Sequence, residues 1–560
     1  MDKIIECVPN FSEGRDKSII NQITNEISAV DGAKLLNVDP GADTNRTVVT
    51  FVGSPEAVVE AAFQAVKKAA ELIDMSKHSG AHPRMGATDV CPFIPVAGTT
   101  IEECIRLAEQ LGERSGESLK IPGYLYGKAA KKPERENLPD IRKGEYEALP
   151  EKLKDPDFAP DFGPAEFNAK SGAIVVGVRD FMLAYNINLN TKDRSLAHDI
   201  ALDLRESGRA KRDKNGEIIR DADGKAIKVP GKLKFMQGAG WIIEEYGYAQ
   251  VTMNLHNYHV TGLHTAFEAV RGEAAKRGLR VTGSELIGLT PKEALLDAGK
   301  FYLRQQGKHI GLAERDIIHI AILSLGLNDT SPFDPNERII EYAMQEKQDK
   351  LVDKSVDDFV HELSTDSPAP GGGSVSALSG ALSAGLLSMV ANLTYGKKNY
   401  KRHNKTMEQV ALDAQRLKSE YNTLVDEDTA AFNGFMSALR LPKKTEQDQQ
   451  LRHQAMQSAA QRMTEVPFTT LRHANDLLDL AEQVVKKGNI NAVSDAGVAA
   501  LQAEAAAVGA YFNVRINLPQ IEDVEFKENI LREADILLKD VQAKKRRIVR
   551  QATKKIAEQI

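Results

Sequence analysis

The amino-acid sequence predicts a multidomain protein: two α+β (α/β sandwich) subdomains followed by an all-α helical bundle. Short β-branched runs alternate with amphipathic helical patterns over the first part of the chain, and helix formers dominate after Gly373. The length of 560 residues suits three or four units of about 100–200 residues each. We expect subdomains at 1–178 and 179–327, a linker at 328–350 and a helical domain at 351–560.

The first subdomain is expected to carry its helices on one face of a sheet. Strand-forming stretches occur at 3–11, 33–41, 46–54 and 88–96. Helical spacing occurs at 17–30, 55–73 and 100–116. The second of these helices has the clearest start, because Ser54 can cap it and Pro55 suits a first helical position. Repeated prolines over 121–170 predict extended loops rather than a helix.

The second subdomain is expected to open with a strand pair at 172–190, followed by a helix at 195–208. Residues 214–231 contain Asn-Gly and Asp-Gly and predict a polar hairpin. Strands at 249–258 and 280–288 would complete this unit.

The C-terminal part is expected to be a helical bundle reached through a connector and helix at 328–350. Heptad-like spacing over 404–439 supports it, and Pro442, Pro467 and Pro519 are expected to break helices. The stretch 371–396 is weakly polar, but its small and hydroxyl residues suit close helix packing better than a membrane span.

Composition narrows the function classes. The net charge of −6 is too mild to indicate a nucleic-acid partner, and the basic stretch at 544–555 is expected to be a solvated helix face. Cys7, Cys91 and Cys104 lack the spacing of a disulfide framework or a zinc site. A reducing, cytoplasmic compartment is therefore the expectation, and the N-terminal residues do not have the pattern of a signal peptide.

The stretch Lys77–Asp89 has the densest set of groups suited to catalysis. His78 and His82 could transfer protons near neutral pH, and Arg84 could hold a carboxylate through two hydrogen bonds. Two glycines in the same stretch could make room for a ligand: Gly80 and Gly86. The alternative is a surface loop with two solvated histidines, and the residue types alone do not choose between the histidines.

Three other stretches have both an ordinary and a functional interpretation. Residues 39–47 predict a turn, but Asp39 could orient a histidine and Arg46 could bind an acid. The glycines of 371–373 could be a linker or could offer backbone N–H groups to a ligand. Asp426 and Asp428 would point to different faces of a helix, so one could be buried and act as an acid or base.

Several stretches together resemble one bifunctional family, and they cover nearly the whole chain. The following resemble glutamate formimidoyltransferase: ECVPNFSEG (6–14), DPGADTNRTVVTFVG (39–53), IDMSKHSGAHPRMGATDVCPFIPV (73–96) and GWIIEEYGYAQVTMNL (240–255). The following resemble formimidoyltetrahydrofolate cyclodeaminase: DSPAPGGGSVSALSGALSAGLLSMVANLTYG (366–396), LVDEDTAAFNGFMSALRLPK (424–443) and GAYFNVRINL (509–518). Their order matches the bifunctional formimidoyltransferase–cyclodeaminase family of histidine degradation and one-carbon metabolism.

The resemblance implies two linked reactions. The formimino group of N-formimidoyl-L-glutamate moves to N5 of tetrahydrofolate, and the adduct then cyclises to 5,10-methenyltetrahydrofolate with release of ammonia. The resemblance places the transferase histidine at His82 and the cyclodeaminase carboxylate at Asp428. It places the transferase folate segment at Gly163, Pro164, Ala165, Glu166, Phe167, Asn168, Ala169, Lys170, Ser171 and Gly172. From the residue types, our hypothesis is that Asp39 orients or tunes His82.

The expected ligands are the formimidoyl donor and tetrahydrofolate, polyglutamated and used as a co-substrate, with no metal and no redox cofactor. The resemblance also implies a ring-like homo-oligomer. The residues alone leave two alternative functions open. One is a related enzyme that transfers a formyl instead of a formimino group, and the other is a folate-binding scaffold without turnover. The residues also leave open the roles of His78, Arg46 and Arg84.

Overall fold

The computed structural model describes residues 3–42, 44–80, 82–243, 247–344 and 350–559. They fall into two compact units. One comprises Met1–Ala298 with Ile322–Glu346, and the other comprises Gly299–Ala321 with Lys347–Ile560. Residues 244–246, inside the family-like stretch 240–255, and 345–349, inside the predicted linker, lie outside the described residues.

The first sheet has seven strands: β1 (Ile4–Cys7), β2 (Asn10–Phe11), β3 (Ala33–Gly41), β4 (Arg46–Gly53), β5 (Thr88–Ala97), β6 (Gly123–Gly127) and β7 (Ile174–Val178). Their order is β1-β4-β2-β5-β7-β6, with β3 paired to β4. β7 runs parallel to both β5 and β6, whereas the other paired strands are antiparallel.

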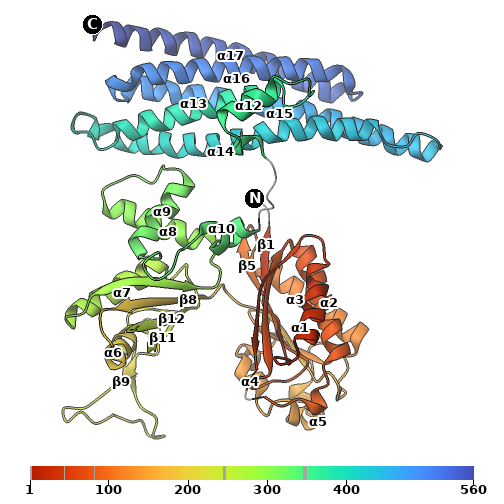
Figure 1. Ribbon diagram of the computed structural model, residues 1–560, viewed down its shortest axis with the longest axis vertical. Helices are drawn as coiled ribbons and strands as arrows, with labels where there is room; N and C mark the ends of the chain where they lie inside the picture. The colour runs from red at the N-terminus through yellow and green to blue at the C-terminus, as the bar shows by residue number, and fades with distance from the viewer. Residues whose placement is uncertain (1–2, 43, 81, 244–246, 345–349, 560) are drawn as a thin grey trace. The chain divides into compact units, whose positions relative to one another are not determined.

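Three helices cover one face of this sheet, as predicted: α1 (Lys17–Ser28), α2 (Pro55–Leu72) and α3 (Ile101–Leu119) (Figure 1). Ser54 accepts a hydrogen bond from Ala57 N–H at the start of α2, with Pro55 as the first helical residue. Thr100 and Glu103 form a capping box at α3. Apolar side chains of the sheet and the helices form the core between them.

The prediction of loops without helix over 121–170 is wrong. This region holds strand β6, two short helices, α4 (Leu138–Arg142) and α5 (Leu149–Lys152), and 3₁₀ turns at Pro133–Arg135, Tyr146–Ala148 and Pro156–Phe158. Four prolines stand in the first turns of these elements, where a missing N–H costs nothing: Pro133, Pro139, Pro150 and Pro156. The region packs on the sheet face opposite α1–α3, around Tyr124 and Tyr126.

The second sheet contains β11 (Met236–Ile243), β12 (Tyr248–Leu255), β8 (Leu183–Leu189) and β13 (Val281–Ile287) in that order, all antiparallel. Helices α6 (Arg194–Leu204) and α7 (Leu263–Lys276) pack against it (Figure 1). The predicted strand pair at 172–190 is therefore wrong as a pair, because β7 belongs to the first sheet and β8 to the second. The sequence prediction also missed β11, α7, α8 (Lys292–Gln305) and α9 (Glu314–Leu325).

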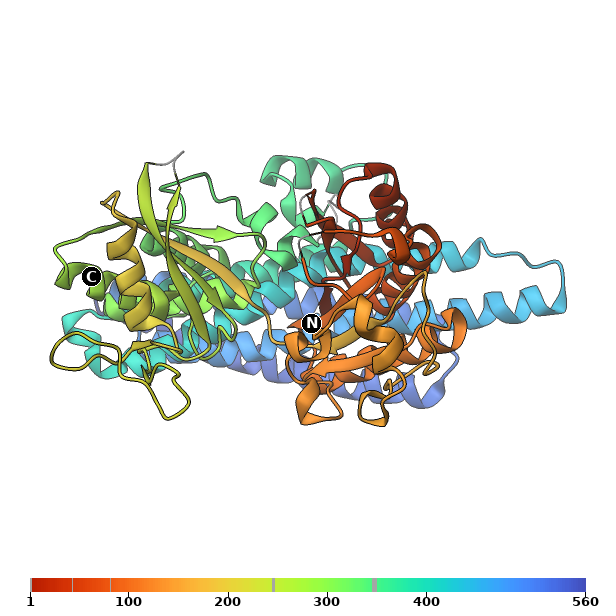
Figure 2. The ribbon, with the colours of Figure 1, turned by 90° about the horizontal axis from the view of Figure 1, so that it is seen from below.

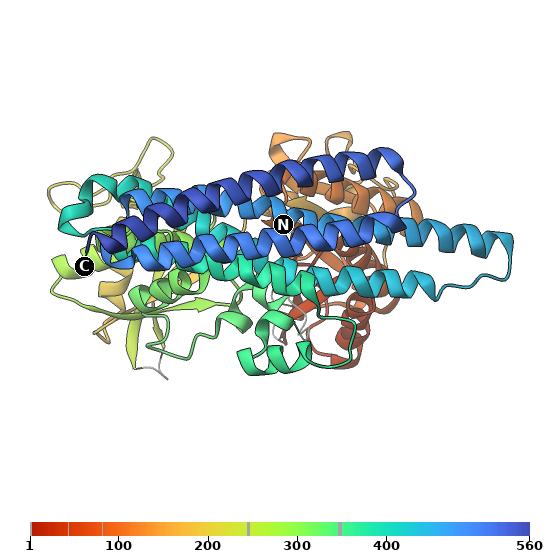
Figure 3. The ribbon, with the colours of Figure 1, turned by 90° about the horizontal axis from the view of Figure 1, so that it is seen from above.

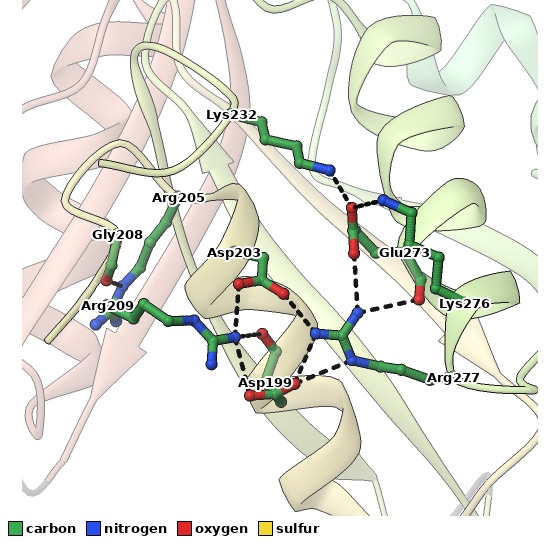
Figure 4. A network of polar contacts seen from close by, with 9 residues as sticks. All are labelled: Asp199, Asp203, Arg205, Gly208, Arg209, Lys232, Glu273, Lys276 and Arg277. Atoms are coloured by element: carbon green, nitrogen blue, oxygen red, sulfur yellow. Dashed lines mark hydrogen bonds and ion pairs between the residues drawn. The ribbon is translucent and has the colours of Figure 1, made fainter. Parts of the chain in front are cut away.

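The predicted polar hairpin is an arm of two successive small loops (Figure 2). β9 (Arg209–Ala210) and β10 (Lys228–Val229) pair at its base, and isolated bridges close its loops at Arg212–Ile218 and Arg220–Ala226. An ion-pair network fixes the base to α6 and α7 (Figure 4). In it, Arg209 and Arg277 share Asp199 and Asp203, while Lys232, Lys276 and Arg277 share Glu273. Hydrogen bonds from Lys232 and Lys276 lower the pKa of Glu273 to about 2.

The connector contains two short helices, α10 (Pro335–Arg338) and α11 (Ile340–Ala343). The bundle that follows consists of α12 (Val356–Leu363), α13 (Gly372–Thr394), α14 (Asn404–Leu439), α15 (Glu446–Lys487), α16 (Val493–Asn517) and α17 (Val524–Ala557). The long helices lie side by side (Figure 3), and alanines line much of their core. Small side chains let helix backbones approach closely, as the composition of 371–396 predicted.

Among the described residues, one helix, α13, is long and apolar enough to cross a membrane, but 61% of its most apolar window is buried. Pro467 does not break a helix as predicted; it lies inside α15. A proline at this position leaves the carbonyl of Met463, four residues earlier, without its helical donor. The Asn517 side-chain amide supplies a donor instead, 2.7 Å from that oxygen, so a contact from α16 makes the proline tolerable.

Candidate functional site

The histidine loop, residues 77–89, connects the turn after α2 to strand β5. Both glycines of this loop lie so close to neighbouring backbone that a side chain would not fit. A Cβ atom on Gly80 would lie 2.2 Å from the Thr44 carbonyl oxygen, and one on Gly86 would lie 2.3 Å from that of Ala173. The expectation that these glycines make room for a ligand is therefore corrected: they let the loop lie against neighbouring backbone.

The two histidines of the loop have different surroundings. His82 Nδ1 lies 2.7 Å from the Pro83 carbonyl oxygen, which can only accept, so Nδ1 carries the proton and Nε2 keeps its lone pair. Burial and the nearby Arg46 guanidinium lower the pKa of His82. A neutral imidazole with a free Nε2 lone pair is the form that accepts a proton from a reacting group.

Both ring nitrogens of His78 are occupied by the protein. Arg84 Nε donates to His78 Nδ1 at 3.3 Å, and His78 Nε2 donates to the Asn45 carbonyl at 2.9 Å. Arg84 also forms a two-point ion pair with Glu147 and a further one with Glu145. These side chains line a cavity of about 450 Å³ together with Ser79, Gly80 and Gly144. His78 thus serves as a link between loops.

A buried carboxylate lies behind His82. Asp89, on β5, is 0% exposed and forms ion pairs with Arg46 and Arg142. Its Oδ1 also accepts the Met85 backbone N–H at 2.9 Å. Two guanidinium groups share one carboxylate, so the cluster has a surplus positive charge beside His82. Neither Asp89 nor Arg142 was singled out from the sequence, although Asp89 is a charged residue inside an apolar strand.

Asp39 lies on β3 opposite Val48 of β4, and its side chain is exposed. Within the described chain, the Pro83 carbonyl contacts His82, and the charges of Arg46, Arg142 and Asp89 shift its pKa. Asp39 is not among them, and its orienting role stays a prediction. Arg46 and Arg84 both have carboxylate partners within the protein, and their contact with a substrate acid also stays a prediction.

The segment 163–172 lies against the histidine loop. Gly86 and Gly172 form an isolated antiparallel bridge, and Ala87 N–H donates to the Ser171 carbonyl at 2.8 Å. Asn168 closes the segment on itself by accepting from Ser171 N–H with its side chain and from Gly172 N–H with its carbonyl. Phe167 stays exposed with its ring 5.5 Å from that of Tyr146. Two segments far apart in the sequence thus meet at one place.

The second candidate site lies in the bundle, on α14. Asp428 contacts the first turn of α13, where Ser374 Oγ lies 3.3 Å from its Oδ2. Asp426, two residues earlier, accepts the Leu351 backbone N–H at 2.7 Å on another side of the helix. Burial raises the pKa of both carboxyls. The structure therefore separates the two aspartates, and Asp428 is the one held against α13.

Family models match three consecutive parts of the chain. Residues 4–179 match "Formiminotransferase domain, N-terminal subdomain", residues 184–345 match "Formiminotransferase domain", and residues 355–536 match "Formiminotransferase-cyclodeaminase". The chain is 45% identical to the mouse formimidoyltransferase-cyclodeaminase over 96% of its own length and 97% of that protein. The chain belongs to the formimidoyltransferase-cyclodeaminase family.

Other relatives match one part each. The glutamate formimidoyltransferase of Streptococcus pyogenes is 41% identical and covers 54% of this chain and 94% of its own length. The methenyltetrahydrofolate cyclohydrolase of Methylorubrum extorquens is 37% identical and covers 36% of this chain and 98% of its own length. The histidine loop and the Asp428 site thus lie in parts of the chain that correspond to separate proteins elsewhere.

Proposed function

We propose that this protein transfers the formimino group of N-formimidoyl-L-glutamate to N5 of tetrahydrofolate and then cyclises the adduct to 5,10-methenyltetrahydrofolate with release of ammonia, in histidine degradation. The observation that carries the proposal is the 45% identity to a bifunctional relative along 97% of that relative's length. The two chemically suited sites, around His82 and Asp428, fall in the matching halves.

His82 is the proton-transfer group of the first reaction. Attack of N5 on the formimino carbon gives a tetrahedral carbon with three nitrogens, where one amine loses a proton and the departing glutamate nitrogen gains one. A neutral imidazole whose Nε2 is free can do both in turn. His82→Ala should abolish transfer while the fold is retained; near-normal turnover of a folded variant would contradict this role.

The residues around His82 have supporting roles in the proposal. Arg46 and Arg84 hold donor carboxylates, helped by the surplus positive charge of the Asp89 cluster. Asp39 orients or tunes the histidine. The exposed side chains of residues 163–172 contact tetrahydrofolate, which is a co-substrate and carries a polyglutamate tail.

Asp428 is the acid of the second reaction. N10 attacks the formimino carbon, and the leaving nitrogen must gain a proton to depart as ammonia. Burial raises the pKa of the Asp428 carboxyl, which favours the protonated form that can donate. Cyclisation with loss of ammonia involves no net oxidation or reduction, so the proposed reaction needs no redox cofactor.

The assembly is proposed to be a homo-oligomer in a reducing, cytoplasmic compartment. The support for an oligomer is a set of exposed apolar side chains on two bundle helices that pack against each other, α13 and α16. These side chains are Leu382, Met389, Leu393, Val498, Leu501, Phe512 and Ile516. A second copy of the chain would cover side chains of this kind. Sedimentation should show an oligomer that Leu501→Glu weakens, and a monomeric wild-type protein would contradict the proposal.

The test of the overall function is direct. The protein is incubated with tetrahydrofolate and N-formimidoyl-L-glutamate, and methenyltetrahydrofolate absorbance is followed together with ammonia. Both should rise together. A parallel reaction with N-formyl-L-glutamate tests the formyl alternative. If only the formyl donor is turned over, the protein is a formyltransferase. If neither donor gives product, the remaining interpretation is a folate-binding scaffold without turnover.

A second activity of the helical part is favoured by one observation, the 37% identity to a methenyltetrahydrofolate cyclohydrolase. Such an activity would hydrolyse the methenyl product, so its absorbance would rise and then decay. To distinguish the two activities, methenyltetrahydrofolate is added to the protein without the other substrates. If it disappears no faster than without protein, the protein has no cyclohydrolase activity.

A further inference from the structure

The first turn of α13 forms a surface against which the Asp428 carboxyl is seated. α13 begins at Gly372, directly after Gly371, and Asp428 approaches it from α14. Three contacts define the arrangement: one with the Cα face of Gly373, one with the Ser374 backbone N–H and one with the Ser374 hydroxyl. One of the three consecutive glycines, Gly373, thus has a specific structural explanation.

Gly373 is a glycine because the carboxyl occupies the place of its side chain. A Cβ atom there would lie 2.0 Å from Asp428 Oδ1 and 2.4 Å from its Cγ. Side-chain atoms do not approach so closely, so alanine would displace the carboxyl from its seat. The nearest obstacle is the end of one side chain rather than backbone, which makes displacement of Asp428 a smaller change than unfolding of the helix.

Ser374 holds the same carboxyl through two donors. Its backbone N–H has no intrahelical partner in the first helical turn and faces Asp428, where it lowers the pKa of the carboxyl. Its hydroxyl lies 3.3 Å from Asp428 Oδ2, 2.9 Å from the Val425 carbonyl oxygen and 3.2 Å from Thr429 Oγ1. Thr429 can donate to Ser374 and leave the serine proton for Asp428 or Val425. Both bonds to Asp428 favour its ionised form and oppose the effect of burial.

We propose that Gly373 and Ser374 are positioning residues that fix the Asp428 carboxyl and set the pH range in which it donates its proton; this rests on the proposed cyclodeaminase function. Starting from the formimidoyl group as an amidinium cation, N10 forms its bond to the formimino carbon. Asp428 gives its proton to the NH₂ group, the C–N bond breaks with its electron pair on nitrogen, and ammonia leaves. The Asp428 carboxylate then takes the proton of N10, which restores the acid.

The experiment measures cyclodeamination of 5-formimidoyltetrahydrofolate from low to high pH in the full-length protein, with formimino transfer as an internal measure of folding. Ser374→Ala removes a bond that favours the carboxylate. The pKa of Asp428 therefore rises, and the loss of activity at high pH should move upward by about half a pH unit, since the long, shared bond contributes less than a full charged one. Ser374→Thr keeps the hydroxyl and should keep the profile.

Matched controls separate positioning from general stability. Ser383 is another buried serine of α13, and its hydroxyl donates to the Ala499 carbonyl at 2.8 Å. Ser383→Ala should change stability without moving the pH profile. Gly373→Ala should lower cyclodeamination at least about tenfold, the order expected for a misplaced catalytic group, and leave transfer intact. Gly434→Ala, on α14 with nothing within 4 Å of its Cβ position, should leave both activities unchanged.

Three results would overturn the proposal. One is an unmoved pH profile in Ser374→Ala; another is normal cyclodeamination by Gly373→Ala. The third is a change in Ser383→Ala equal to that in Ser374→Ala, which would make the serine merely structural. Failure of the proposed function is recognised separately, because wild-type protein would then release no ammonia from 5-formimidoyltetrahydrofolate; that result removes the positioning roles as well.

Discussion

Replacing Asp89 by asparagine removes one charge from the buried cluster behind His82 and changes the shape of the side chain little. Asp89 is 0% exposed and neutralises both Arg46 and Arg142. Removing one partner of a buried ion pair costs about 3–5 kcal/mol, because the remaining charge is left uncompensated. Here two guanidinium groups remain, and burial together with the charge of Arg142 already lowers the pKa of Arg46. We expect a loss at the upper end of that range.

Thermal unfolding followed by circular dichroism measures this loss. About 5 kcal/mol corresponds to a fall of roughly 10 °C in the transition of a unit of this size. Asp39→Asn is the matched control, because Asp39 is exposed and such substitutions change stability by less than about 0.5 kcal/mol. The asparagine variant should also lose transferase activity at acid pH less readily than wild type, since Asp89 raises the pKa of His82. A stability change below about 1 kcal/mol in Asp89→Asn would refute the reasoning.

Three further predictions follow from named groups. Burial lowers the pKa of His82, so transferase activity should be constant near pH 7 and fall only below the ordinary imidazole value of about 6.5; a fall centred above pH 7 would contradict the role of neutral His82. Burial raises the pKa of Glu6 from 4.5 to about 7, so unfolding releases its proton between these values and Glu6 destabilises the fold as pH rises. Glu6→Gln should therefore stabilise the protein at pH 8 by up to about 3 kcal/mol and hardly at pH 4, and equal denaturation midpoints at pH 8 would contradict this. Asn517→Ala removes the donor to the Met463 carbonyl and should cost about 1–3 kcal/mol; the cost should shrink when Pro467 is also replaced by alanine, and identical costs in both backgrounds would show that the amide does not compensate for the proline.

Local sequence signals predicted individual elements well. The cap at Ser54 and Pro55 located the start of α2, and heptad spacing located α14 over 404–439. Non-local pairing was out of reach of such signals. β7 and β8 adjoin in the sequence but join different sheets. Pro467 continues a helix only because Asn517, fifty residues later, supplies a donor. The domain boundaries at 178, 327 and 350 stay predictions.

In the candidate sites, too, residue types could be interpreted from the sequence but contacts between distant residues could not. The residue types of the histidine loop indicated proton transfer, yet only three-dimensional contacts distinguish His78, with both nitrogens occupied, from His82. The roles of Asp89 and Arg142 could not be predicted, because their ion pairs join residues far apart in the sequence. A spacing of two residues predicted that Asp426 and Asp428 diverge, but which one contacts α13 depends on how the helices pack.

The central claim is that one chain carries two independent reactions, with His82 and Asp428 each serving one. The most direct test is the amount of ammonia released per glutamate released by Asp428→Asn, given N-formimidoyl-L-glutamate and tetrahydrofolate. The wild-type ratio should be near one. In Asp428→Asn, glutamate release should continue at the wild-type rate and the ratio should fall almost to zero. A ratio that stays near one, or loss of both products from a folded variant, would contradict the account.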